Sequence, residues 1–247
     1  MGGVVINILV CIKYTEGEGL NPFAGYALEA AARLRDKDPS VRVTAVCLGP
    51  EAAVSVLRRA LAIAADRAYL LTGFHEEELD HRGVSELLCR GVAALEARVG
   101  PIELIFCGRQ APDRDSGQTG PLLAQRLGWP QVTCALEAEA DGDRITVRRE
   151  TCDATEVLSA QLPCLIAFTK PGWEPRLPSV SRSVAAVNAA VPTLTPEDVP
   201  GGAQPPLLRF LGRRTVPRRS GLVRIREETD ADSARTLFKL LNTTGVI

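Results

Sequence analysis

Apolar runs and amphipathic stretches alternate along the chain as far as Trp129. Residues 4–12 form an almost uninterrupted apolar run, which is typical of a strand buried on both faces. Further strands are predicted at 41–48, 68–71 and 102–107. Apolar residues at helical spacing lie between them: Phe23, Ala27, Ala30, Ala31 and Leu34; Val54, Leu57, Leu61 and Ala64; Val84, Leu88, Gly91, Val92 and Leu95. The alternation predicts an α/β fold with a mostly parallel, doubly wound sheet covered by helices on both faces.

Two of the helix starts have distinctive sequences. Asn21 is typical of an N-cap and Pro22 of the first helical position. A further helix is predicted at 116–127, with Pro121 inside its first turns. Parallel sheets of this kind bind ligands at the carboxyl ends of their strands, near the switch in strand order, so a site is expected there.

The pattern changes after Trp129. Residues 132–139 and 144–150 alternate as strands around Asp141-Gly142, which predicts an antiparallel hairpin. Strands are also predicted at 156–160 and 162–169. Residues 192–217 are rich in Pro and Gly and resemble an extended arm, and a short amphipathic helix follows at about 230–241. We therefore divide the chain into an α/β domain at 1–190 and an arm with a terminal helix at 191–247, which we expect to dock on a partner chain.

Charge and hydropathy narrow the class of protein. The net charge is -1, which gives no reason to expect nucleic acid as a partner. No apolar run is long enough to cross a bilayer, so no membrane insertion is expected. The first residues lack the features of a signal peptide, and the cytoplasm is the expected location.

The cysteines and histidines do not suggest a metal site or a catalytic site. None of the seven cysteines is spaced as CxxC, and Cys11, Cys47, Cys107 and Cys164 lie in predicted strands as small buried side chains. The two histidines, His75 and His81, lie in a polar stretch, which argues against both a metal site and a histidine-based triad.

The stretch CGRQAPDRDSGQTGP at 107–121 carries the most chemistry. It follows a predicted strand and precedes a helix, and its glycines permit a tight backbone path close to a ligand. Backbone N–H groups at the start of the helix favour an anion, most often a phosphate. The plainer interpretation is a polar connection to a capped helix. The stretch matches neither the P-loop nor the Rossmann pattern.

Extended over 107–133, this stretch resembles the nucleotide-binding loop and following helix of electron-transfer flavoprotein beta subunits, the FixA-like family, with its G-[KR]-Q-A-x-D-x-D-x-x-Q-x-G and LxWPQ patterns. Six more segments match in order: LVCIK at 9–13, NPFAGYALEAAARL at 21–34, ALAIAADRAYLL at 60–71, VRRE at 147–150, LPCLIAFT at 162–169 and EPRLPS at 174–179. The resemblance covers about residues 9–183.

The resemblance implies a role as an electron carrier without catalytic residues of its own. Such beta subunits pair with an alpha subunit that holds most of the FAD. The beta subunit itself holds AMP, or a second FAD in bifurcating members. The presence of Phe23 in NPF favours AMP. The family's nucleotide contacts carry over to these residues: Cys11, Asn21, Pro22, Phe23, Ala24, Leu48, Gly108, Arg109, Gln110, Ala111, Asp113, Asp115, Ser116, Gly117, Gln118 and Thr119.

Three further residues are implied to bind partner proteins. Glu150 matches a glutamate that contacts the mobile flavin domain of the alpha subunit. Val180 lies at the apolar tip of the loop that anchors dehydrogenases, and Arg176 shapes that loop.

The chain departs from the family in having only seven residues between Lys13 and Asn21, and in having AAVNAAV at 185–191 in place of a lysine-rich run.

Two other classes of protein are alternatives. A stand-alone nucleotide-binding regulator resembling universal stress proteins would share the sheet, but the arm and the EPRLPS loop argue against it. An adenylating enzyme of the ATP pyrophosphatase type needs a Ser-Gly-Gly loop after the first strand, where this chain has YTEGEG at 14–19.

Overall fold

The structure is a computed structural model that describes residues 6–17, 19–75, 78–201, 205–208, 211–212, 214 and 223–246. The chain divides into two compact units, Met1–Arg209 and Phe210–Ile247. The strands are β1 (Asn7–Ile12), β2 (Tyr14–Thr15), β3 (Gly19–Leu20), β4 (Arg42–Leu48), β5 (Arg67–Leu71), β6 (Leu104–Gly108), β7 (Gln131–Asp141), β8 (Arg144–Glu150), β9 (Thr155–Gln161), β10 (Cys164–Phe168) and β11 (Thr193–Leu194). The helices are α1 (Pro22–Lys37), α2 (Val54–Ile63), α3 (His81–Val99), α4 (Thr119–Leu127), α5 (Val180–Val187) and α6 (Asp230–Thr243).

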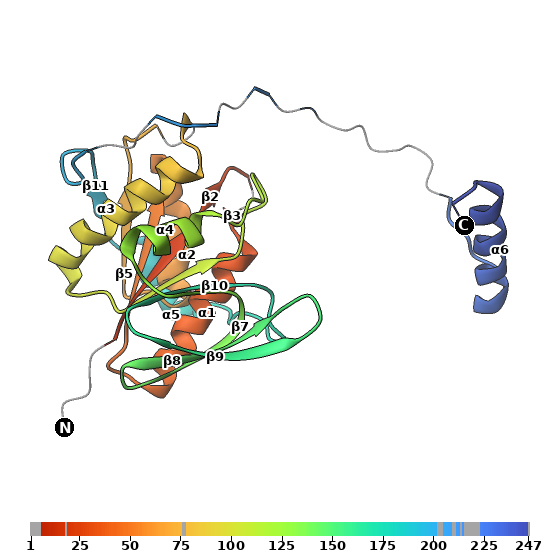
Figure 1. The fold of residues 1–247 in the computed structure, drawn as a ribbon, viewed down its shortest axis with the longest axis horizontal. Coiled ribbons are helices and arrows are strands. Elements are labelled where there is room, and N and C mark those ends of the chain that lie inside the picture. Colours follow the sequence, from red (N-terminus) through yellow and green to blue (C-terminus); the bar gives the residue numbers. More distant parts are fainter. Residues whose placement is uncertain are drawn as a thin grey trace. The chain divides into compact units, whose positions relative to one another are not determined.

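The first unit is built on one large sheet with the strand order β11-β5-β4-β1-β6-β10-β7-β8-β9 (Figure 1). All strands from β11 to β7 run parallel, and β8 and β9 extend the sheet antiparallel. β1 lies between β4 and β6 and pairs with both. The chain passes first to β4, on one side of β1, and later to β6, on its other side. The predicted α/β class, with a mostly parallel sheet and added antiparallel strands, is confirmed.

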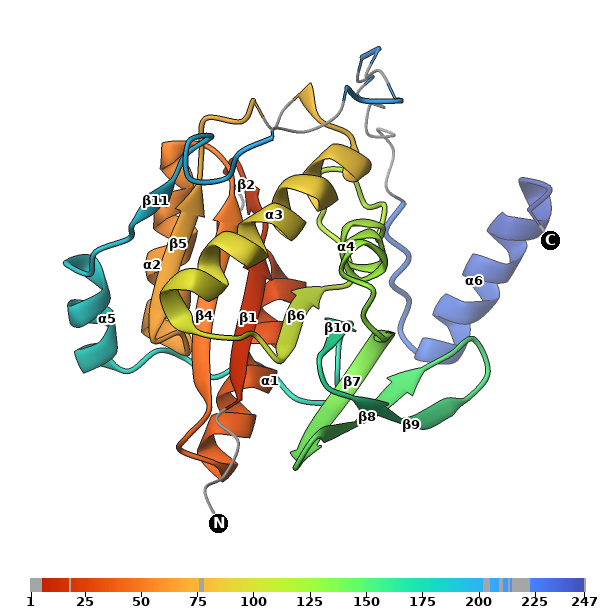
Figure 2. The same cartoon turned by 60° about the vertical axis from the view of Figure 1, so that its left-hand side comes forward.

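Helices cover both faces of the parallel strands. α3 and α4 pack together on one face, and α1, α2 and α5 lie on the other (Figure 2). Alternate residues of β1 therefore enter two separate apolar clusters: Ile8 and Val10 lie under α1 and α2, and Leu9 lies under α3 and α4. Burying one such side chain contributes about 1.5–3 kcal/mol, and this double burial explains the uninterrupted apolar run.

Several element boundaries differ from the sequence predictions. Residues 4 and 5 of the first predicted strand lie outside the described residues. α4 begins at Thr119, three residues later than predicted, with Pro121 in its first turn. In the hairpin, Asp141 pairs with Arg144, so the turn residues are Gly142 and Asp143. Within the predicted arm, β11 pairs with β5 and belongs to the sheet.

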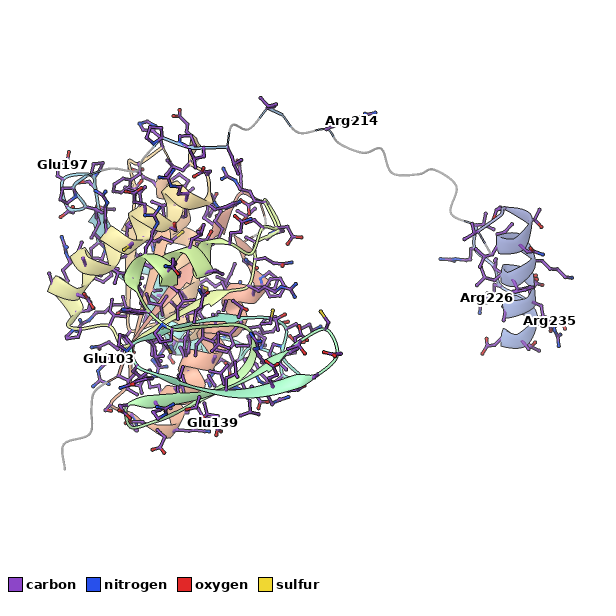
Figure 3. The ribbon with its side chains drawn as sticks, in the orientation of Figure 1. Glu103, Glu139, Glu197, Arg214, Arg226 and Arg235 are labelled. Carbon is purple, nitrogen blue, oxygen red and sulfur yellow. The ribbon has the colours of Figure 1, made fainter. Side chains whose placement is uncertain are left out.

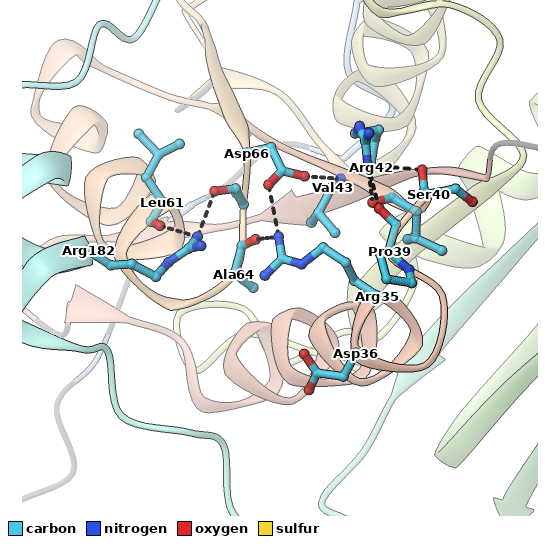
Figure 4. A network of polar contacts seen from close by, with 12 residues as sticks. Arg35, Asp36, Pro39, Ser40, Arg42, Val43, Leu61, Ala64, Asp66 and Arg182 are labelled. Atoms are coloured by element: carbon cyan, nitrogen blue, oxygen red, sulfur yellow. Dashed lines mark hydrogen bonds and ion pairs between the residues drawn. The ribbon is translucent and has the colours of Figure 1, made fainter.

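The short helix α5 is fixed to the end of α2 by Arg182. Its guanidinium donates hydrogen bonds to the carbonyl oxygens of Leu61, Ala62 and Ala65 at 2.8–3.1 Å (Figure 4). These carbonyls lie at or just beyond the last turn of α2, where a cation is favoured by the helix dipole. The segment that follows the EPRLPS loop is therefore held firmly on the sheet domain.

The second unit contains α6 as its only helix among the residues described there. Thr229 caps the helix by accepting a hydrogen bond from Asp232 N, and Arg235 forms an ion pair with Asp232 at 2.8 Å (Figure 3). None of its described residues is buried, and Phe238 is largely exposed. Across the described part of the chain, no helix is both long and apolar enough to cross a membrane.

Candidate functional site

A cavity of about 130 Å³ opens at the carboxyl ends of β1 and β6. This is the point where the strand order changes direction, and ligands of parallel sheets bind there. Most of the residues predicted to bind a nucleotide line the cavity: Cys11, Asn21, Ala24, Leu48, Gly108, Arg109, Gln110, Ala111, Asp113, Asp115, Ser116, Gly117, Gln118 and Thr119. Pro22 and Phe23 do not line it.

Asn21 joins α1 to the loop at 109–118. Its side-chain oxygen accepts a hydrogen bond from Phe23 N at 3.0 Å and so caps the helix, as the sequence predicted. Its Nδ2 donates to the carbonyl oxygen of Gln110 at 2.7 Å. Asn21 is buried, so both polar groups need these partners. The structure thus gives Asn21 a positioning role at the cavity.

Gly108 allows the start of α1 to approach the end of β6. A Cβ atom at this position would lie 2.7 Å from Phe23 Cβ and 2.9 Å from the carbonyl carbon of Phe23. Any side chain at 108 would therefore push the two elements apart. Phe23 lies close to the end of β6, although it does not line the cavity.

The loop between β6 and α4 has an unusual backbone. Asp115 has φ +49 and Gly117 has φ +62, so the residue before Ser116 and the residue after it both adopt the left-handed region. Arg109 N donates to Phe168 O at 2.8 Å and Asp115 N to Ala111 O at 2.8 Å, and these bonds fix the path of the loop. Such alternation of backbone conformation turns N–H groups toward a common point, which suits an anion.

The start of α4 faces this loop. Its N-cap residue, Gln118, makes no side-chain capping hydrogen bond. The first N–H groups of a helix have no partners within the helix, and the positive end of the helix dipole lies there. A phosphate group at this position would receive hydrogen bonds from the backbone without needing a lysine.

Ionisable residues from three segments of the chain also surround the cavity. Lys13, just after β1, lies 3.6 Å from Asp113, and Arg114 donates to the carbonyl oxygen of Leu79 at 2.6 Å. His81, the first residue of α3, lies with its Nδ1 3.3 Å from Ser116 Oγ. Neither Lys13 nor His81 is among the residues that the sequence predicted for the site. Lys13 could have been found from its position directly after a strand, whereas His81 meets the loop only through the packing of α3.

Two thiols lie side by side where β1 and β6 end. Cys11 and Cys107 are register partners on these strands, and both line the cavity. Burial raises the pKa of Cys11 far above its ordinary value and that of Cys107 to about 12. Both thiols are therefore neutral near pH 7, and they form a weakly polar wall suited to an aromatic base rather than a nucleophile.

The three predicted partner-binding residues lie away from the cavity. Arg176 bonds the buried Glu29 at 2.7 Å and Asp36 at 2.6 Å, and so ties the EPRLPS loop to α1. Glu150 accepts a hydrogen bond from Thr169 at 3.3 Å. Val180 is the first residue of α5 rather than part of a loop, and it is 82% exposed. Leu177, which the sequence analysis did not single out, is 86% exposed beside it.

No group of three or more metal-ligating side chains occurs among the described residues. The cavity instead combines a weakly polar wall, a loop with two left-handed residues that leads into α4, and several cations. This arrangement can hold an anionic ligand with an aromatic part.

Comparisons with known proteins agree with the sequence motifs. The family model described as "Electron transfer flavoprotein domain" matches residues 8–196. The electron transfer flavoprotein subunit beta of Megasphaera elsdenii is 35% identical over 87% of this chain and 82% of its own length. The subunit CarD of the caffeyl-CoA reductase-Etf complex of Acetobacterium woodii is 35% identical over 73% of this chain and 67% of its own.

A third relative, the protein FixA of Azorhizobium caulinodans, is 35% identical over 70% of this chain and 62% of its own length. The match to the family model spans the whole parallel sheet, including β11 and the loop that lines the cavity. The chain therefore belongs to the electron transfer flavoprotein family, and its relatives identify it with the beta subunits.

Proposed function

We propose that this chain binds AMP in the cavity between β1 and β6 and pairs with an alpha subunit that holds FAD. In this role it supports electron transfer between dehydrogenases and a downstream acceptor, and the bound flavin supplies the redox chemistry. The observation that carries the proposal is the cavity itself, because the loop predicted to bind a nucleotide forms it together with Cys11, Asn21 and Leu48.

The chemistry of the cavity suits the parts of AMP. The neutral thiols of Cys11 and Cys107 and the side chain of Leu48 offer apolar contacts for adenine. The backbone at Gly117, and the start of α4, offers donors for the phosphate. The two regions lie within one cavity, so a ligand with a base at one end and a phosphate at the other would use both.

A second FAD in place of AMP is the alternative. The relative named as part of a reductase-Etf complex favours a closer involvement in catalysis, and the cations Lys13 and Arg114 extend the polar part of the site. The NPF motif with Phe23, through the family resemblance, favours AMP over a second FAD.

The partner surfaces are part of the proposal. Glu150 would contact the alpha subunit, and α6 with the segment before it would dock on the same subunit. Val180 and Leu177, both strongly exposed and apolar, would anchor a dehydrogenase by burial in a pocket of that enzyme. Arg176 would hold their loop in place through its bonds to Glu29 and Asp36.

Two matched glycine variants test the nucleotide site. Gly117→Ala places a side chain at φ +62 inside the predicted anion loop, and Gly142→Ala does so at φ +60 in the distant β7–β8 turn. Each should cost about 1 kcal/mol of stability, since αL is unfavourable for alanine. We expect calorimetric titration with AMP to show at least about tenfold weaker binding for Gly117→Ala alone. Equal affinities for both variants would contradict the proposed site.

A further inference from the structure

His81 occupies an unusual position for one of only two histidines in the chain. It is the first residue of α3, directly after the N-cap Asp80, whose carboxylate accepts a hydrogen bond from Gly83 N at 2.9 Å. His81 lines the cavity. The loop that His81 contacts is distant in the sequence, since Ser116 follows His81 by 35 residues.

The contact of His81 is with the anion loop itself. Its Nδ1 lies 3.3 Å from Ser116 Oγ, and Ser116 is flanked by the two left-handed residues Asp115 and Gly117. Arg114, two residues before Ser116, donates a hydrogen bond to the carbonyl oxygen of Leu79. Leu79 in turn lies two residues before His81. Two contacts, His81–Ser116 and Arg114–Leu79, thus join the start of α3 to the loop. Of these residues of α3 and its N-terminal flank, His81 also lines the cavity.

The charges around His81 favour its neutral form while no anion is bound. Burial lowers its pKa, and so do the nearby cations Arg114 and Lys13, against the opposing effect of Asp80 and Asp113. The N-terminal position on α3 disfavours a positive charge in the same direction. A phosphate at the anion loop would add negative charge to this group of residues and would favour the imidazolium.

We propose that His81 is a positioning residue of the anion loop that takes up a proton when a phosphate binds, so that affinity for a nucleotide's phosphate rises as pH falls. This inference rests on the proposed nucleotide site and adds a residue and a pH dependence to it. The proton comes from solvent, binds to the imidazole and is released when the ligand leaves. Adenosine, which has no phosphate, takes up no such proton.

The chain offers matched variants for the test. His81→Asn keeps a polar atom near the position of Nδ1 and removes the titratable group. His75→Asn changes the other histidine, which does not line the cavity and whose φ of +51 asparagine tolerates. Affinity for AMP is measured by calorimetry from pH 5.5 to 8.5 on the full chain, in complex with its alpha subunit if the chain requires it.

The ratio of wild-type to variant affinity cancels the titration of AMP's own phosphate. For His81→Asn we expect this ratio to rise by roughly three- to tenfold between pH 8.5 and 5.5, because a pKa rise of one unit corresponds to about tenfold. For His75→Asn it should stay constant. With adenosine, both ratios should stay constant.

Nuclear magnetic resonance gives a second readout, the pKa of His81. That pKa would not respond to AMP if His81 only held the loop in place. With two histidines, each ring signal is assigned from the two variants. The pKa of His81 should rise on addition of AMP and stay unchanged on addition of adenosine. Parallel pH profiles for wild type and His81→Asn, with no change in the pKa of His81, would overturn this inference and leave the nucleotide site standing. Absence of nucleotide binding at every pH would overturn both.

Discussion

At the scale of single residues, the site depends on residues that set the path of the backbone. Asn21 caps α1 and bonds the loop, Gly108 lets α1 reach β6, and Gly117 permits the turn before α4. None of these residues brings a reactive group.

The two bonds of Asn21 can be separated by substitution. Asn21→Ala removes the helix cap and the donor to Gln110, and we expect a loss of roughly 2 kcal/mol in unfolding free energy. Asn21→Asp keeps the cap but turns a carboxylate toward the Gln110 carbonyl oxygen. AMP affinity should fall at least about tenfold in both variants, as measured by calorimetry.

Ser179→Ala is the matched control, since Ser179 caps α5 far along the chain from the cavity. It should cost about 1 kcal/mol in chemical denaturation and leave AMP affinity unchanged. An Asn21→Asp protein with normal affinity would show that the bond to Gln110 does not position the loop.

At the scale of elements, the EPRLPS loop is held on α1 by a small ion network. Burial by itself would raise the pKa of Glu29, but hydrogen bonds from Arg176 and Arg33 outweigh it and lower that pKa. A hydrogen bond from Arg176 likewise lowers the pKa of Asp36. Carboxylates with lowered pKa values stabilise the fold above their unfolded-state pKa values, and this contribution is lost as pH falls through the folded-state values.

This network predicts a pH-dependent difference between wild type and Arg176→Met. At pH 7 the variant leaves Glu29 buried without its main partner, and we expect a loss of roughly 2 kcal/mol in unfolding free energy. As pH falls through the lowered folded-state pKa values, the wild-type carboxylates also become protonated, so the difference should be smaller at pH 3.5 than at pH 7. Denaturation curves at pH 7, 5 and 3.5 measure it.

Arg235→Met is the control, because the Arg235–Asp232 pair is exposed on α6 and should contribute little at any pH. A difference between wild type and Arg176→Met that is the same at pH 7 and pH 3.5 would mean that packing of the arginine, and not the ion network, holds the loop.

The elements also show what the sequence could and could not predict. The buried strands, the β7–β8 hairpin and the loop before α4 follow from local patterns, and the structure contains all three. β11 has two residues and exists only because it pairs with β5, so no local pattern marks it. α5 begins after a Ser179 cap, whereas the family resemblance implied that Val180 lies at the tip of a loop.

Likewise, only some of the residues that line the cavity could be predicted from the sequence. Residues that follow strands or lie in the loop at 107–121 could be assigned from the family motif. His81 could not, because α3 reaches Ser116 only through tertiary packing between segments 35 residues apart. Physical proximity across the sheet edge, and not sequence pattern, brings such residues to the site.

At the scale of the whole molecule, the chain combines a sheet domain that has a buried core with exposed apolar side chains. Leu177, Val180 and Phe238 are largely exposed, and burial of such side chains is what partner proteins usually provide. Membership in the electron transfer flavoprotein family gives these surfaces a proposed use, as contacts with an alpha subunit and with dehydrogenases.

The central claim is that this chain holds AMP as part of a flavoprotein heterodimer. The most direct measurement is to co-express it with its alpha subunit, purify the complex, and identify the released nucleotides by chromatography and mass. We predict one FAD and one AMP per heterodimer. Two FAD would contradict the AMP assignment and support the bifurcating alternative, and a chain that forms no complex and releases no nucleotide would contradict the account as a whole.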